Sequence, residues 1–187
     1  LNNYPFASAL KVNKQATRLS NQARGRPENR HDGGKATMFI LDQMKLSGIT
    51  PDVVTCTSIL QCLEEAGSWE EAVRFLESME DASSFTTTKE GPPITLPPPN
   101  AFAYASVISV CFGCGQINKA MQLLDRLPEV ISSDVTPETW LYNRALQALL
   151  NPHRHSHAKA PIIANGPENR FDIAADILRR MKKVAMT

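Results

Sequence analysis

The chain has 187 residues, of which 42% are hydrophobic, and a formal net charge of +1. This composition suits one folded core or an array of small units, and it excludes a disordered tail and a histone-like polybasic protein. The charges are unevenly spread: residues 1–35 hold seven basic and two acidic residues, residues 36–100 three and ten, and residues 101–187 ten and seven. Phosphate contacts are therefore expected toward the two ends. No run approaches 18 apolar residues, so we expect no membrane-spanning helix.

Eight segments carry apolar residues at the i, i+3, i+4, i+7 spacing of one helix face. In chain order these stripes cover residues 6–13, 37–44, 56–63, 72–79, 104–111, 120–127, 142–149 and 174–181. Every second stripe begins with a small residue and ends with Met or Leu, so the stripes fall into four pairs. The first stripe is the weakest, because it ends on the polar Asn13. The pattern predicts four pairs of amphipathic helices.

The helix pairs recur at a regular interval. Leu60 and Leu76, at equivalent places in the third and fourth stripes, are 16 residues apart, and Leu41 lies 19 residues before Leu60. Together these intervals give a repeat of about 35 residues. One pair cannot bury both of its stripes alone, whereas stacked pairs can. We therefore expect an all-α fold, an α-solenoid of four antiparallel helix pairs.

Long insertions interrupt this repeat. We divide the chain into repeats at about 3–52, 53–100, 101–138 and 139–187, with insertions at 21–34, 82–99 and 151–170. The second insertion is rich in Pro, Ser and Thr, which predicts an extended or disordered loop. The other two share the motif Pro-Glu-Asn-Arg, at residues 27–30 and 167–170, before the second helix of a pair. Asp32 or Asp172 is expected to cap that helix or to lie near its N-terminus. Alternatively, the arginines contact phosphate or protein.

Some helix ends are also encoded locally. Gly67 is expected to end the third helix, where a residue with positive φ costs little. Ser68 and Glu71 have the spacing of a capping box, which predicts that Ser68 caps the fourth helix. Asn151 precedes a proline and is expected to stop the seventh helix.

Two clusters contain residue types that bind metals. His153, His155 and His157 alternate in one loop, and such a run can chelate a transition metal. Because no carboxylate or thiol is placed beside them, a partly cationic loop is the preferred interpretation. Cys111 and Cys114 form only half of a zinc site, and Cys111 falls on an apolar stripe, which favours core packing. We expect neither a metal nor a cofactor.

Catalytic motifs are missing from the sequence. It contains no Gly-rich phosphate loop, no G-x-S-x-G and no H-E-x-x-H. We therefore expect a protein that is not an enzyme and takes no small-molecule substrate, the alternative being part of an enzyme whose catalytic domain is missing. Four scattered cysteines are too few for a secreted disulfide framework, which favours a reduced, intracellular setting.

The stretch from Gly48 to Leu60 reads G-I-T-P-D-V-V-T-C-T-S-I-L and resembles the junction between pentatricopeptide repeats. Partial versions recur at residues 99–108 and 137–146. The resemblance covers most of the chain outside the insertions. It implies a right-handed superhelix that binds single-stranded RNA in mitochondria or chloroplasts, with one base per repeat.

The resemblance also implies that two side chains read each base, one near the start of a first helix and one at the close of the same repeat. The central repeat supplies Thr57 and Asn100, a pairing that implies adenine, because a hydroxyl and an amide can complement one base edge. The preceding repeat pairs Ala7 with Asp52, and alanine cannot hydrogen-bond a base.

The following repeat pairs Ala105 with Glu138, and Asn143 takes the first reading position of the last repeat. The alternative is that these polar residues are solvated turn and helix-start positions. Candidates for contacts with the RNA backbone or a partner are the basic residues Lys11, Lys14, Arg18, Arg24, Arg26, Arg30, Arg144, Arg154 and Arg170.

These observations favour a non-catalytic RNA-binding or scaffold protein within a large RNA-containing organellar assembly, such as an organellar ribosome. There, RNA and neighbouring proteins would be the partners, and the insertions would be ordered by those neighbours. The alternatives are a sequence-specific factor for single-stranded RNA in organellar RNA processing, stability or translation, and a protein scaffold without RNA contact.

Overall fold

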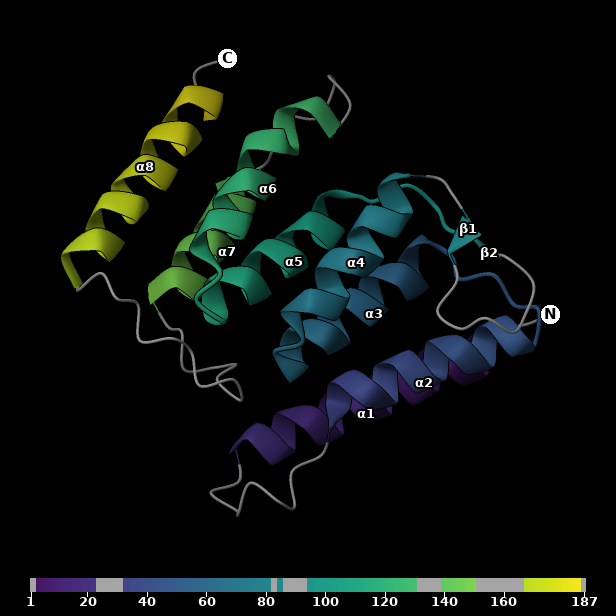
Figure 1. Ribbon diagram of the computed structural model, residues 1–187. Helices are drawn as coiled ribbons and strands as arrows, with labels where there is room; N and C mark the ends of the chain where they lie inside the picture. Colours follow the sequence, from purple (N-terminus) through teal and green to yellow (C-terminus); the bar gives the residue numbers. More distant parts are fainter. Residues whose placement is uncertain are drawn as a thin grey trace.

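The computed structural model describes residues 3–22, 32–81, 84–85, 94–130, 139–150 and 167–185. These residues form eight helices, as the apolar stripes predict, and the α-solenoid fold is confirmed (Figure 1). In chain order the helices are α1 (Tyr4–Gln22), α2 (Gly33–Leu46), α3 (Val53–Ala66), α4 (Trp69–Glu80), α5 (Ala101–Gly113), α6 (Ile117–Val130), α7 (Thr139–Leu150) and α8 (Pro167–Ala185). None of these helices combines the length and the apolar character needed to cross a membrane.

The helices stack in two layers. The first helices α1, α3, α5 and α7 pack side by side, and each second helix packs on the first helix of its own pair. The second helices α2 and α4 also pack on the first helix that follows them, which joins one pair to the next. The α1–α2 pair lies at one end of the array and α8 at the other (Figure 1).

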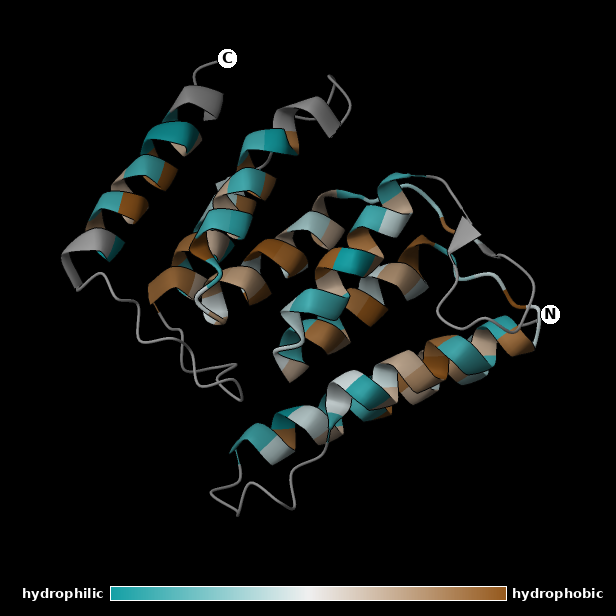
Figure 2. Cartoon of the chain, in the orientation of Figure 1, coloured by the Kyte–Doolittle hydropathy of each residue, from teal (hydrophilic) through white to brown (hydrophobic). Residues whose placement is uncertain are grey.

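The core follows the apolar stripes, and its centre is α5. Every residue of α5 from Ala103 to Gly113 is buried, because α3 and α7 flank the helix and α4 and α6 cover it. Figure 2, in which the ribbon is coloured by residue hydropathy, shows hydrophobic and hydrophilic stretches alternating along the other helices, as expected where one face of each helix is apolar. Each outer helix therefore has one apolar face, whereas α5 has no solvated face beyond its first turn.

The α1–α2 pair is held partly by polar contacts. Asn13 is buried and its Nδ2 donates to the carbonyl oxygen of Gly33 at 3.0 Å and to Thr37 Oγ1 at 2.8 Å. Thr17 is also buried, and a Cβ added to Gly33 would lie 2.0 Å from its Oγ1. The stripe of α1 thus continues through Asn13 and Thr17, where glycine allows close approach.

The predicted helix ends are confirmed at Gly67 and Asp32. Gly67 ends α3 with a φ of 71°, and Asp32 caps α2 by accepting a hydrogen bond from the backbone N–H of Lys35 at 3.0 Å. The capping box at Ser68 is wrong in part: Ser68 precedes α4, but its side chain makes no capping hydrogen bond. A Cβ on Gly34 would lie 2.1 Å from Ser68 Oγ, so this hydroxyl is directed at α2 instead.

Asp172 does not cap α8, because the helix already begins at Pro167. It has the alternative expected position, near the helix N-terminus, in the second turn. Proline suits the first turn of a helix, where its missing N–H would have no intrahelical partner. The motif at 167–170 is therefore helical, and Arg170 lies in the first turn of α8.

Parts of the insertions contain short extended segments or lie outside the described residues. Strands β1 (Ser84–Phe85) and β2 (Ile94–Thr95) pair in antiparallel register. The residues singled out in the sequence that lie outside the description are Arg24, Arg26, Arg30, Glu138, Asn151, His153, Arg154, His155 and His157.

Candidate nucleic-acid interface

Two of the predicted base-reading residues are helix caps at one edge of the first-helix layer. Asp52 Oδ1 accepts a hydrogen bond from the backbone N–H of Thr55 at 2.7 Å, at the start of α3. Asn100 Oδ1 accepts one from Ala103 N–H at 2.9 Å, at the start of α5. The hydrogen bonds from Thr55, led by that of its side chain, lower the pKa of Asp52, so this side chain stays ionised at neutral pH. The carboxylate thus gives this edge a fixed negative charge, and Asn100 keeps its amide N–H groups for other partners.

The first reading positions differ in their exposure. Thr57 is partly exposed, and its Oγ1 donates to the carbonyl oxygen of Val53 at 2.8 Å, which leaves the oxygen able to accept a hydrogen bond. Asn143 and Ala7 are exposed on α7 and α1. Ala105, in contrast, is only 2% exposed. The structure therefore leaves Thr57 open to a ligand but closes the equivalent position of α5.

An apolar row lies three residues before these positions, and our sequence reasoning missed it. It consists of one side chain from each first helix, namely Tyr4, Val54, Phe102 and Trp140. Tyr4 and Val54 are each 73% exposed and Phe102 is 55% exposed, although a folded protein normally buries such side chains. The register of the repeats would have found the row, because it occupies the same place in every first helix. Exposed apolar and aromatic side chains of this kind can stack on unpaired bases.

The last two side chains of the row, Phe102 and Trp140, contact each other and leave no space between them for a base. The rings of Phe102 and Trp140 stack with centroids 4.8 Å apart and an interplanar angle of 27°. This contact fills the space between the starts of α5 and α7, so no base can enter there without separating the rings.

A second contact lies one turn further along α7, and it joins α7 to α3. Arg144 on α7 forms an ion pair with Glu64 on α3, and the pair spans α5. The side chain of Glu64 is mostly buried. Ser106 Oγ on α5 and Arg144 Nε are buried polar atoms without a partner in the described structure. Arg144 is thus engaged with a carboxylate rather than presented freely to a phosphate.

The remaining basic candidates are distributed over both ends. Lys11 and Arg18 are exposed and lie seven residues apart on α1, hence on one face. Lys14 Nζ donates to Gln61 Oε1 of α3 at 2.7 Å. Arg170 on α8 is half-buried. The structure brings Lys11 and Arg18 together and leaves Arg170 at the opposite end of the array.

The cysteines pack in the core, as expected for Cys111 and Cys114. All four are free thiols, and burial raises the pKa of Cys111 to about 12 and that of Cys114 to about 11. Both thiols therefore stay protonated at neutral pH. In the described part of the chain, no three His, Cys, Asp or Glu residues are placed to hold a metal ion.

Comparison with known proteins supports the repeat assignment. The family model of the pentatricopeptide repeat domain matches residues 39–83, and a PPR repeat model matches residues 102–129. A pentatricopeptide repeat-containing protein of Arabidopsis thaliana, described as mitochondrial, is 27% identical over 142 residues. The match covers 74% of this chain and 18% of that relative, so the chain spans less than a fifth of the relative's length.

Proposed function

Because this chain is a pentatricopeptide repeat protein, we propose that it binds single-stranded RNA along the starting edge of its first helices. The observation that carries this proposal is the exposed row of Tyr4, Val54 and Phe102 beside Thr57 and Asn100. A stacking surface next to hydrogen-bonding side chains is what unpaired bases require.

We further propose that base reading is confined to the gap between Val54 and Phe102. Thr57 and Asn100 border this gap and offer both hydrogen-bond acceptors and donors. The next gap is filled by the stacked rings of Phe102 and Trp140, and Ala105 is buried beneath it. With so few reading positions, most of the affinity comes from stacking and from the cations of α1.

Binding that depends mainly on stacking and cations, with few base-reading positions, favours a non-catalytic component of a large RNA-containing organellar assembly. A factor that selects a long sequence would need more reading positions. The mitochondrion is the proposed compartment, since the Arabidopsis relative is described as mitochondrial. Lysates of isolated mitochondria separated on density gradients test this proposal. The chain should migrate with large particles and shift to light fractions after ribonuclease treatment, whereas migration as a free protein in untreated lysate contradicts it.

RNA binding is tested by fluorescence anisotropy with labelled oligoadenylate, oligouridylate and oligocytidylate at low salt. Val54→Ser should weaken binding to every oligonucleotide about fivefold or more, since covering an apolar side chain of this size contributes roughly 1.5–3 kcal/mol when its burial is complete. Phe39→Ser is the matched control, because Phe39 is an equally exposed apolar side chain on the opposite layer. Absence of binding by the unaltered chain at low salt contradicts the proposal.

Two further variants separate base reading from backbone contact. Asn100→Asp keeps the helix cap, because both residues cap equally well, but it removes the amide donor. It should abolish a preference for oligoadenylate and leave the free energy of unfolding unchanged. Arg18→Gln should weaken all oligonucleotides equally and lower the salt slope by about 0.7. If Asn100→Asp leaves the base preference intact, Asn100 does not read the base.

A further inference from the structure

The outward face of α8 differs from that of the earlier second helices. Leu178 is 48% exposed, whereas the leucines at its place in the other three second helices are at most 2% exposed: Leu41, Leu76 and Leu124. Phe171 is 71% exposed, whereas its counterparts Trp69 and Ile117 pack against the core. Apolar residues are therefore left uncovered at this end of the array.

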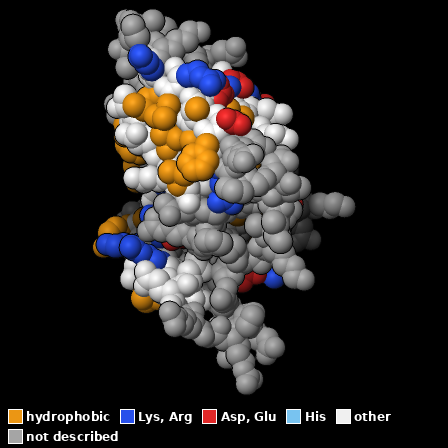
Figure 3. Space-filling view, turned by 90° about the vertical axis from the view of Figure 1, so that its left-hand side faces the viewer, with side chains coloured by type: hydrophobic (Ala, Val, Ile, Leu, Met, Phe, Trp, Pro, Cys, Tyr) orange, Lys and Arg blue, Asp and Glu red, His pale blue; other side chains and the backbone are white. Residues whose placement is uncertain are grey.

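The uncovered residues form a compact stripe. Phe171, Ala175 and Leu178 follow the i, i+4, i+7 spacing of one helix face. Asp172 and Arg179 are exposed, lie seven residues apart and flank the stripe on the same side. Figure 3, which looks onto this end of the molecule, shows hydrophobic side chains along α8 with basic and acidic groups beside them.

We propose that this stripe is a two-fold interface, in which α8 packs antiparallel on α8 of a second copy of the chain. Placing Ala175 opposite the second copy's Ala175 sets Phe171 opposite the second copy's Leu178. The same register sets Asp172 opposite the second copy's Arg179. One arrangement thus covers both large apolar residues and pairs both charges, twice over, as two-fold symmetry requires.

The order of charges along α8 favours a second copy over other occupants. Among the described side chains of α8, one exposed acid, Asp172, precedes the central Ala175, and two exposed bases, Arg179 and Lys182, follow it. Arg179 also forms an exposed ion pair with Asp176 of its own helix at 3.6 Å. An antiparallel partner with the same order is complementary, whereas a parallel partner sets like charges together. Packing of α8 on α1 of another copy is disfavoured, since Lys11 and Arg18 are the exposed charges of α1.

The small residue at the centre also fits this arrangement. Ala175 allows the two helix axes to approach closely at the two-fold axis, while Phe171 and Leu178 fill the flanks. Residues 171–179 span only about 12 Å of helix, so the interface is small and the dimer should be weak.

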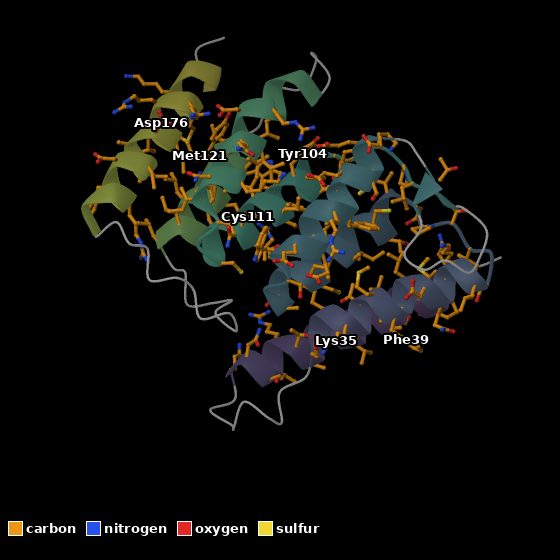
Figure 4. All side chains as sticks on the ribbon, viewed as in Figure 1. Lys35, Phe39, Tyr104, Cys111, Met121 and Asp176 are labelled. Atoms are coloured by element: carbon orange, nitrogen blue, oxygen red, sulfur yellow. The ribbon has the colours of Figure 1, made fainter. Side chains whose placement is uncertain are left out.

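Sedimentation equilibrium of the full chain, from about 5 to about 500 µM, tests the proposal over the range expected for a small interface. The unaltered chain should pass from monomer to dimer and no further, because a two-fold contact closes on itself. Phe171→Glu should weaken the dimer at least tenfold. Phe39→Glu should not, since Phe39 is 64% exposed on α2 at the far end from Asp176 on α8 (Figure 4). A monomer throughout, or equal effects of the two variants, overturns the proposal.

A charge exchange tests the register itself. Asp172→Arg and Arg179→Asp should each weaken the dimer, because each sets like charges opposite one another. The double variant should recover the dimer, because the pair is restored with its signs reversed. Failure of recovery, with helix content unchanged by circular dichroism, contradicts the antiparallel register. None of these measurements involves RNA, so they stand apart from the proposed function.

Discussion

Arg144 on α7 forms an ion pair with Glu64 on α3, so a single contact joins the two helices that flank α5. The two residues are 80 positions apart in the chain, and the pair links the second helix pair to the fourth. Because the Glu64 side chain is mostly buried, either residue left alone would be a poorly solvated charge.

The first prediction concerns this pair. Glu64→Gln and Arg144→Met should each lower the free energy of unfolding by about 1.5–3 kcal/mol, because each leaves one charge without its partner. The double variant should lose less than the sum of the two, as interacting residues do. Urea unfolding followed by circular dichroism gives the three values, and strict additivity would show that the ion pair does not couple the helices.

The second prediction concerns the close approach of α1 and α2. Gly33→Ala places a methyl group 2.9 Å from Thr17 Cβ, as well as against its Oγ1. Overpacking of this kind costs about 1–3 kcal/mol, which outweighs the gain of about 1 kcal/mol in helix propensity. Thermal unfolding should therefore show a lower Tm for this variant.

Gly48→Ala is the comparison variant, because it tests backbone strain, whereas Gly33→Ala tests a steric clash. Gly48 has a φ of 64° and open space around its Cα, so its alanine variant reports backbone strain without a clash. A Gly33→Ala variant that is as stable as the unaltered chain would mean that α1 and α2 separate easily.

The third prediction concerns alkaline pH. Burial raises the pKa of Cys56 and Cys111 from 9.0 to about 12, and that of Cys62 and Cys114 to about 11. Above pH 9 the unfolded chain loses thiol protons that the folded chain retains, so stability present below pH 9 falls as the pH rises toward 11. Each thiol contributes a slope of about 1.4 kcal/mol per pH unit.

Urea unfolding under reducing conditions at pH 8 and pH 10 measures this slope. Cys62→Ala removes one titrating thiol and should reduce the slope by about a quarter, while lowering stability at both pH values through lost packing. A slope that does not change in this variant would exclude the thiol of Cys62 as a source of the pH dependence.

The fourth prediction concerns the cap of α3. Asp52→Ala should lower the free energy of unfolding by about 1 kcal/mol at neutral pH, because Thr55 N–H loses its acceptor. The folded pKa of Asp52 is lowered, so its contribution is present above pH 4 and is lost as the pH falls through the folded pKa.

Asp52→Asn keeps an equivalent cap at neutral pH and removes the titrating group. Its stability should match that of the unaltered chain at pH 7, and it should depend less on pH between 4 and 2. Equal acid sensitivity of the two chains would assign the acid transition to other carboxylates.

Sequence reasoning predicted all eight helices, because every stripe has the periodicity of a helix that buries one face. It treated Asn13 as the weak end of the first stripe, since a polar residue carries no sign of the partner that will satisfy it. Thr37 and the carbonyl group of Gly33 provide that partner, but only once α1 and α2 are packed. The capping box at Ser68 was wrong for a similar reason, because the hydroxyl lies against Gly34 of another helix.

The candidate interface could be predicted only in part. Thr57, Asn100 and Asp52 lie at the edge that the repeat register assigns to them. The same register could have located Val54 and Phe102, which were not predicted, but their exposure became evident only in the folded chain. The ion pair of Glu64 and Arg144 could not be predicted, because it depends on how α3 and α7 pack on either side of α5.

The complete burial of α5 has a consequence for how the array comes apart. α5 is covered by four neighbouring helices and buried along its length, so it cannot unfold until one of them has moved away. The end helices α1 and α8 have neighbours on one side only. Amide hydrogens of α5 should therefore exchange with solvent most slowly, at a rate set by global unfolding, and protection should fall toward both ends. The array is expected to unfold from its ends inward. One side of the gap between Val54 and Phe102 therefore belongs to α5, the helix that unfolds last.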